Sequence, residues 1–94
     1  MVDELLFEGY QIGLLFGLKP QQCNEAIQMY EKIRLNPRWD NRRSNHGLLI
    51  DCLFIKAKQY KTGITVKKAV KITTNYNGVG TQPKPNQWVT HYTH

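Results

Sequence analysis

The segment 48–55 restricts the fold of this chain more than any other part of the sequence. It reads Leu-Leu-Ile-Asp-Cys-Leu-Phe-Ile, so every face of it is apolar apart from Asp51. A segment without a polar side is stable only where other elements cover it all round. Ser44 or Asn45, just before it, can cap a helix by bonding its free N–H groups. We therefore predict a central buried helix over residues 46–61.

The limits of this helix leave one alternative open. Steps of three and four between residues continue back to Trp39, which would extend one helix over 37–61. The polar, glycine-containing stretch 42–47 favours a break instead, with a short helical turn near 37–42. At the other end, Thr62-Gly63 supplies a stop signal.

Two further helical segments precede the central helix. Residues 20–34 carry apolar side chains at helical spacing, and most of the remaining positions are amides or charges. Pro20 suits the first position of a helix, where its missing N–H costs nothing. Residues 3–16 begin at Asp3, which can act as N-cap, and end before the stop signal Gly17. The sequence predicts a helix over each range, joined by a tight connection.

Glycines recur at every fourth position of the first helix, at Gly9, Gly13 and Gly17, so they lie on one stripe. A stripe without side chains allows another helix to approach closely. We expect Gly9 and Gly13 to pack against a helix of the same chain. A homodimer whose seam runs along the helix bearing these glycines is the alternative.

Residues 64–76 fit two structures. The spacing of their apolar residues suits a helix, whereas the alternation of β-branched residues suits a strand. Asn77-Gly78 is also a hairpin-turn signal. We predict a helix over 64–76, with a short hairpin near 66–82 as the alternative. Residues 77–94 are predicted to form an extended basic tail.

These elements predict a mainly α fold, with a small three- to four-helix domain over 1–76 followed by the tail. A chain of 94 residues can build one modest core, and two cysteines are too few for a disulfide-dense scaffold. The nearly apolar run 5–18 has 14 residues and contains Glu8, so it is too short to span a bilayer. We expect a cytoplasmic protein without a membrane partner.

Charge divides the chain into two parts. Residues 1–31 carry five acids and one lysine, a net charge of −4, whereas residues 32–94 carry twelve cations and two acids, a net charge of +10. A basic segment of this kind attracts polyanions and raises their rate of association. The expected partner is therefore nucleic acid, duplex DNA in the first place, or an acidic protein.

Two groups of cations are expected to form one basic surface. The first surrounds Trp39, whose ring can stack on an unpaired base, and its arginines can fork onto phosphate or guanine; it consists of Lys32, Arg34, Arg38, Arg42 and Arg43. The second consists of lysines, which act as point charges on a phosphate backbone: Lys56, Lys58, Lys61, Lys67, Lys68 and Lys71. The predicted contacts are the whole first group with Trp39, and Lys67, Lys68 and Lys71 of the second.

A helix-turn-helix unit can be placed in two ways on these segments. One uses the helices over 3–16 and 20–34, but the second of these carries two glutamates that repel phosphates. The other uses the central helix and residues 65–76 as recognition helix, which electrostatics favour. The leading hypothesis is a small DNA-binding regulator that contacts phosphates through its C-terminal two-thirds.

Two other functions compete with this hypothesis. The first is a small inhibitor or adaptor, of the size that viruses and mobile elements often encode, which would bind an acidic protein. Its anchors would be aromatic residues, because these dominate interface hot spots: Tyr76, Trp88 and Tyr92. The second is an RNA or single-strand binder that stacks bases on Trp39 and on the tail aromatics.

The sequence does not predict an enzyme, a metal site or a cofactor. Cys52 lies in an apolar run, where a thiol is usually an inert core residue. Asp51 is expected at a boundary position, paired with Arg43 or Lys58. His91 and His94 have the spacing of a metal-binding pair but no evident third ligand.

Overall fold

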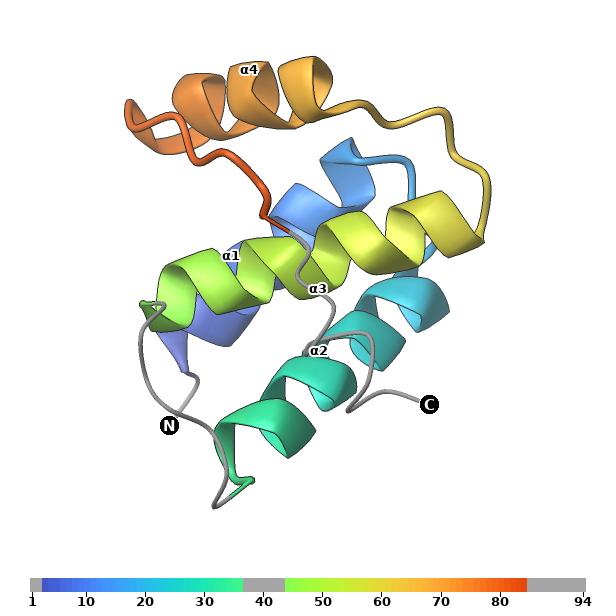
Figure 1. Cartoon of the computed structure of the whole chain (residues 1–94), viewed down its shortest axis with the longest axis vertical. Helices are drawn as coiled ribbons and strands as arrows, with labels where there is room; N and C mark the ends of the chain where they lie inside the picture. Colours follow the sequence, from blue (N-terminus) through green and yellow to red (C-terminus); the bar gives the residue numbers. More distant parts are fainter. Residues whose placement is uncertain (1–2, 37–43, 85–94) are drawn as a thin grey trace.

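The computed structural model describes residues 3–36 and 44–84, and within these ranges it contains helices and no strand (Figure 1). The mainly helical fold class is thereby confirmed. The part of the chain described here holds no helix long and apolar enough to cross a membrane. The helices are α1 (Glu4–Leu15), α2 (Pro20–Arg34), α3 (Asn45–Gln59) and α4 (Val66–Asn77).

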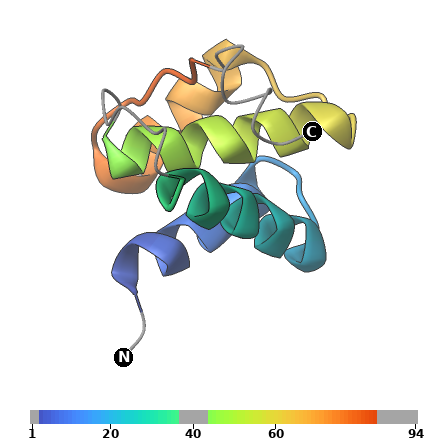
Figure 2. The same ribbon diagram turned by 60° about the horizontal axis from the view of Figure 1, so that its bottom comes forward.

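Helix α3 forms the centre of the domain, as its apolar sequence predicts. It is buried from Gly47 to Ile55 and again at Ala57. Helices α1 and α2 pack against it and against each other, while α4 packs mainly on α1. Figures 1 and 2 show α3 running between α4 and α2. Each fully buried Leu or Ile of α3 contributes about 1.5–3 kcal/mol relative to an exposed one.

Local capping fixes where the first three helices begin. The Asp3 Oδ1 accepts a hydrogen bond from the Leu5 N–H at 2.9 Å, and the Ser44 Oγ accepts one from the Gly47 N–H at 3.0 Å. Pro20 is the first residue of α2, and the Gln22 Oε1 accepts a hydrogen bond from the Lys19 N–H at 2.9 Å. The Asp3 cap is confirmed, and Ser44 rather than Asn45 caps α3. Ser44 is extended, so the alternative of one helix over 37–61 is wrong, and the predicted turn near 37–42 lies outside the described residues.

The two glycines of α1 bring this helix close to its neighbours. A Cβ at Gly9 would lie 2.5 Å from the Leu49 Cδ2, and one at Gly13 would lie 2.7 Å from the Cys23 Sγ. Real Cβ atoms do not come so close, so both positions require glycine in this packing. Close packing within the chain is confirmed. Both glycines are buried against α2 and α3, so neither is exposed to a second copy of the chain.

Residues 66–77 are helical, so the alternative of a hairpin near 66–82 is wrong. Gly78 has φ +81° and ends α4 in the left-handed conformation, which is the physical role of the Asn-Gly pair here. The chain then turns back, and the Thr81 N–H donates to the Thr73 Oγ1 at 2.9 Å. Up to residue 84 this segment has no regular secondary structure, and its one cation is Lys84.

The returning segment reaches α3 at Asp51. The Lys84 N–H donates to the Asp51 Oδ1 at 2.7 Å, and Pro83 beside it is buried. Asp51 is fully buried, so the expectation of a boundary position is wrong. A carboxylate can be buried where hydrogen bonds replace those it made to water. The donor lies 33 residues away in sequence, where local pattern does not reveal it.

The C-terminal ends of α1 and α3 share one backbone motif with different residues at its critical position. After α1, the Leu18 N–H bonds to the Gly13 carbonyl oxygen, and Gly17 between them has φ +98°. After α3, the Thr62 N–H bonds to the Ala57 carbonyl oxygen, and Lys61 has φ +55°. Helix α3 therefore ends at Gln59, two residues before the predicted end at residue 61, and the left-handed position that follows it is a lysine.

Replacing this lysine should stabilise the domain. The left-handed conformation costs a non-glycine residue about 1–2 kcal/mol, whereas glycine loses about 0.5–1 kcal/mol more chain entropy on folding. We expect Lys61→Gly to raise the free energy of unfolding by about 0.5–1 kcal/mol in urea melts. Lys61→Ala removes the charge and keeps the strain, so it serves as the control and should bring no gain. Equal stability of the two variants would show that the left-handed conformation at position 61 does not destabilise the domain.

Candidate functional site

The described part of the basic half concentrates its charge on the end of α3 and on α4. Residues 52–94 contain seven lysines and no Asp or Glu. The run without acids begins directly after Asp51 and is visible in the sequence. Its lysines are Lys56, Lys58, Lys61, Lys67, Lys68, Lys71 and Lys84.

Helix α4 directs its lysines to two sides. Ala69 and Thr73 are buried, and helical geometry places Lys67 and Lys71 on the opposite, exposed face. Lys68 lies on another side, where it lines a hollow with residues of α1. The Thr65 Oγ1 caps α4 by accepting a bond from the Lys68 N–H at 3.1 Å.

The end of α3 adds two more exposed lysines. The Lys58 ammonium lies 5.6 Å from the centre of the Phe54 ring, a cation–π contact that holds the side chain against the helix. Lys61 occupies the left-handed position described above. The connection 60–65 leads from this end directly into α4 (Figure 1). We call the four exposed residues Lys58, Lys61, Lys67 and Lys71 the lysine cluster.

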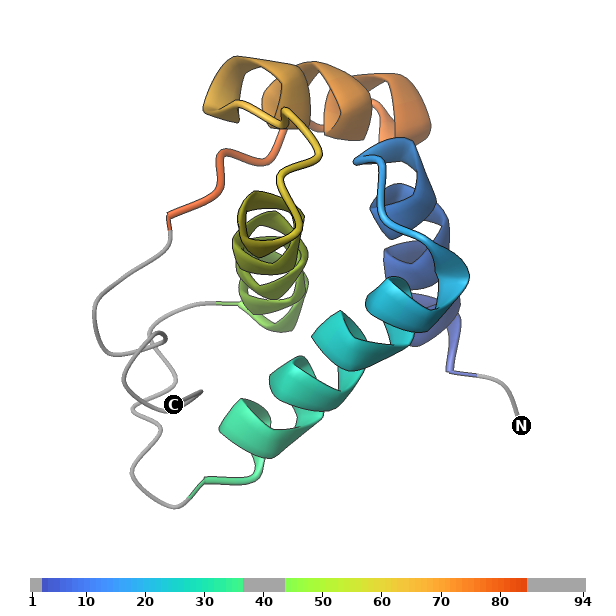
Figure 3. The ribbon, with the colours of Figure 1, turned by 90° about the vertical axis from the view of Figure 1, so that its right-hand side faces the viewer.

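The other predicted basic group lies elsewhere. Lys32 and Arg34 are exposed in the last turn of α2, and the Arg34 guanidinium lies 5.9 Å from the centre of the Tyr30 ring. Figures 1 and 3 place this end of α2 and α4 at opposite ends of the molecule. The prediction of one continuous basic surface is therefore wrong for Lys32 and Arg34. The remaining residues of the first group lie outside the described residues: Arg38, Trp39, Arg42 and Arg43.

Neither pair of helices reproduces the predicted helix-turn-helix unit in full. Helices α3 and α4 are separated by the six residues 60–65, whereas the motif has a turn of three or four. Helix α4 also packs mainly on α1 rather than on α3. Helices α1 and α2 are separated by the four residues 16–19, which suits the motif, but α2 carries Glu25 and Glu31.

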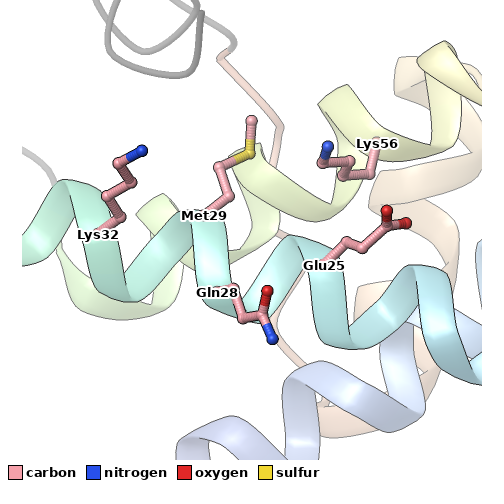
Figure 4. A pocket seen from close by; sticks show the side chains of 5 residues that line it. All are labelled: Glu25, Gln28, Met29, Lys32 and Lys56. Carbon is pink, nitrogen blue, oxygen red and sulfur yellow. The ribbon is translucent and has the colours of Figure 1, made fainter.

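A hollow of about 280 Å³ lies between α2 and α3 (Figure 4). It is lined by Glu25, Gln28, Met29, Lys32 and Lys56. The Tyr60 hydroxyl donates to the Glu25 Oε2 at 2.5 Å, and this hydrogen bond raises the pKa of Tyr60. Figure 4 shows the Glu25 carboxylate on the same side of the hollow as the Lys56 ammonium. A carboxylate at this position disfavours phosphate, so the hollow does not extend the lysine cluster.

The predicted aromatic anchors are only partly within the described residues. Tyr76 is half-buried, and its hydroxyl donates to the Gln11 Oε1, which ties α4 to α1. Tyr76 also lines a hollow of about 300 Å³ with Leu15, Ile72 and Asn75. Trp88 and Tyr92 lie outside the described residues.

The groups capable of covalent or metal chemistry are dispersed. Cys23 and Cys52 are both fully buried and reduced, and burial raises the pKa of each thiol. Both ring nitrogens of His46 are buried without a hydrogen-bond partner among the described residues. Within 3–36 and 44–84, no three His, Cys, Asp or Glu residues come together as metal ligands.

Burial predicts that both thiols are unreactive in the folded protein. An ordinary thiol with pKa near 8.5 is about one-quarter ionised at pH 8, and a raised pKa lowers this thiolate fraction. We expect iodoacetamide at pH 8 to modify Cys52 in the native protein at less than about one-tenth of its rate in guanidinium chloride. Peptide mass spectrometry measures both rates. Equal rates in the two conditions would show that Cys52 is accessible.

Comparisons with known proteins identify no relative: no family model matches the chain, and neither a curated protein nor a solved structure is significantly similar to it.

Proposed function

We propose that this protein is a small DNA-binding regulator that holds the phosphate backbone of duplex DNA with its lysine cluster. The observation that carries the proposal is the exposure of Lys58, Lys61, Lys67 and Lys71 in a region of the sequence without any acid. Among the described residues, no carboxylate forms an ion pair with these four ammonium groups. Their charge is therefore available to an external polyanion.

The chemistry of the cluster favours backbone contact over base reading. Lysine ammonium groups release condensed counterions when they approach phosphates, which makes binding strongly dependent on salt. The domain measures 33 × 31 × 25 Å, so its longest dimension covers about ten base pairs at 3.4 Å each. Direct reading of guanine by forked arginines depends on residues outside the cluster, such as Arg38, Arg42 and Arg43.

A left-handed lysine supports the same assignment. Glycine would relieve the strain at position 61, yet the chain carries a lysine there. Strained backbone conformations are concentrated at functional sites, where the side chain takes part in the function. In this proposal the Lys61 ammonium contributes a phosphate contact at the start of the connection to α4.

Titration of a fluorescent duplex with the full-length protein at several salt concentrations tests the proposal. The double variant Lys67→Gln with Lys71→Gln removes two charges from the exposed face of α4. We expect it to reduce the slope of log Kd against log salt by about 2, because each lost phosphate contact changes the slope by about 1.

A matched variant separates a local site from net charge. Lys32→Gln with Arg34→Gln removes the same two charges from the end of α2, and it should leave the slope nearly unchanged. Equal effects of both variants would show that only net charge attracts the DNA and would overturn the cluster as the site. Absence of binding at low salt would overturn the whole proposal. Tighter binding to single strands than to duplex would assign the protein to the stacking class instead.

A further inference from the structure

Helix α1 presents an apolar outer face. Phe7, Leu14 and Leu15 are exposed by 54%, 41% and 56%, and they are three of the seven large hydrophobic side chains that are exposed among the described residues. Figure 3 shows α1 along one edge of the molecule, with α4 near its C-terminal end. An exposed apolar patch on a small domain marks an interaction surface. Gly9 and Gly13 lie on the inner side of α1, so this outer face does not include the glycine stripe.

Two hollows adjoin this face where α1 meets α4. The first, of about 300 Å³, is lined by Leu15, Ile72, Asn75 and Tyr76. The second, of about 190 Å³, is lined by Leu15 and Ile72 as well, together with Gly17 and Lys68. Their volumes lie at or below the small end of ligand pockets, about 300 Å³. They suit a single inserted side chain better than a cofactor.

The face has opposite charges at its two ends. Glu4 and Glu8 lie in the first half of α1, and Glu8 is held there by a 3.1 Å hydrogen bond from the Asn77 Nδ2. Lys68 lies at the other end, beside Gly17. The hydrogen bond from Asn77 to Glu8, and the hollow that Ile72 and Leu15 both line, show that α4 runs antiparallel to α1 along this face. The gradient from acid to base thus follows the axis of α1.

We propose that this face binds a second copy of the chain in a symmetric dimer, with the two α1 helices antiparallel. A two-fold dimer requires a self-complementary surface, and antiparallel pairing places each acidic end against a basic end. Phe7 and Leu14 are seven residues apart, which is about two turns or 10.5 Å, so each can meet the other across the axis. The patch and its charges match one occupant, this chain itself.

The register of the pair follows from the positions of the apolar residues. When Phe7 lies opposite the partner's Leu14 and the partner's Leu15, its ring reaches the hollow that Leu15, Ile72 and Tyr76 line. In the same register Glu4 lies opposite the partner's Gly17, which borders the hollow containing Lys68. The dimer thus pairs an aromatic anchor with a hollow and a carboxylate with an ammonium group, twice.

Sedimentation equilibrium of the full-length protein at low salt tests the dimer. We expect a concentration-dependent equilibrium between monomer and dimer. Phe7→Ser should raise the dimer Kd by about 30-fold or more, as loss of a central aromatic anchor does. The control Leu35→Ser removes an even more exposed apolar side chain, 73% accessible, from the end of α2 and should leave the Kd within about twofold.

Charge reversal tests the register. Glu4→Lys or Lys68→Glu alone should each raise the dimer Kd about fivefold to tenfold, because like charges then face each other. The two changes in one chain restore opposite charges and should return the Kd close to that of the wild type. A protein that stays monomeric at every concentration, or a Leu35→Ser effect equal to that of Phe7→Ser, would overturn the dimer. A double variant weaker than either single variant would overturn the register.

The dimer and the proposed DNA contact can fail separately. The dimer uses Lys68, on the side of α4 that faces α1, whereas the lysine cluster uses Lys67 and Lys71 on the outward side. Phe7→Ser leaves the cluster untouched, and the Lys67 and Lys71 variant leaves the α1 face untouched. A monomeric protein that still binds DNA would refute the dimer alone.

Discussion

The burial of α3 on all sides is the constraint from which the rest of the fold follows. Its apolar residues need neighbours on every side, and the other helices of a short chain must supply them. Helix α1 can approach closely only because Gly9 and Gly13 leave room for Leu49, Leu53 and Cys23. Glycines weaken a helix by about 1 kcal/mol each. Packing against α3 offsets that cost, so α1 depends on the helix it covers.

The same constraint explains why one carboxylate is deeply buried. Asp51 is the only polar position within the apolar run 48–55, and it is fully covered. Its hydrogen bond from the Lys84 N–H links α3 to a segment that follows α4. The link closes the chain over α3. No acid follows Asp51, so the lysines that come after it have no acidic neighbour in the sequence. A structural role for this acid therefore coexists with a basic surface beyond it.

Local physics made most of the fold predictable. The Asp3 and Ser44 caps, Pro20 and the Gly17 stop act through hydrogen bonds within a few residues, so the sequence shows them. The Asn77-Gly78 pair was ambiguous because a left-handed glycine serves hairpins and helix ends alike. The Lys84 bond to Asp51 joins residues distant in sequence, so it was not predictable from pattern.

The candidate site was less predictable than the fold. The lysines of α4 were identified from charge alone, but charge does not tell which cations share a surface. Lys32 and Lys67 belong to the same basic half, but Lys32 lies in the last turn of α2 and Lys67 in the first turn of α4. Figures 1 and 3 place this end of α2 and helix α4 at opposite ends of the molecule. Lys61 became prominent only through its backbone angle, which its residue type would not suggest. Surface placement depends on how helices pack, and that is a long-range property.

Helix α4 connects the two proposed surfaces. Its periodicity gives Lys67 and Lys71 an outward direction and turns Lys68 and Ile72 toward α1. The twelve-residue helix α4 thus contributes Ala69 and Thr73 to the core, and it also carries residues of two different surfaces. A two-fold dimer would carry two lysine clusters on one particle and double the number of phosphates that it neutralises. Because each phosphate contact adds to the salt dependence, dimerisation would steepen it without any new DNA contact within a protomer. In the proposed dimer, the apolar face of α1 would therefore affect DNA affinity without contacting DNA.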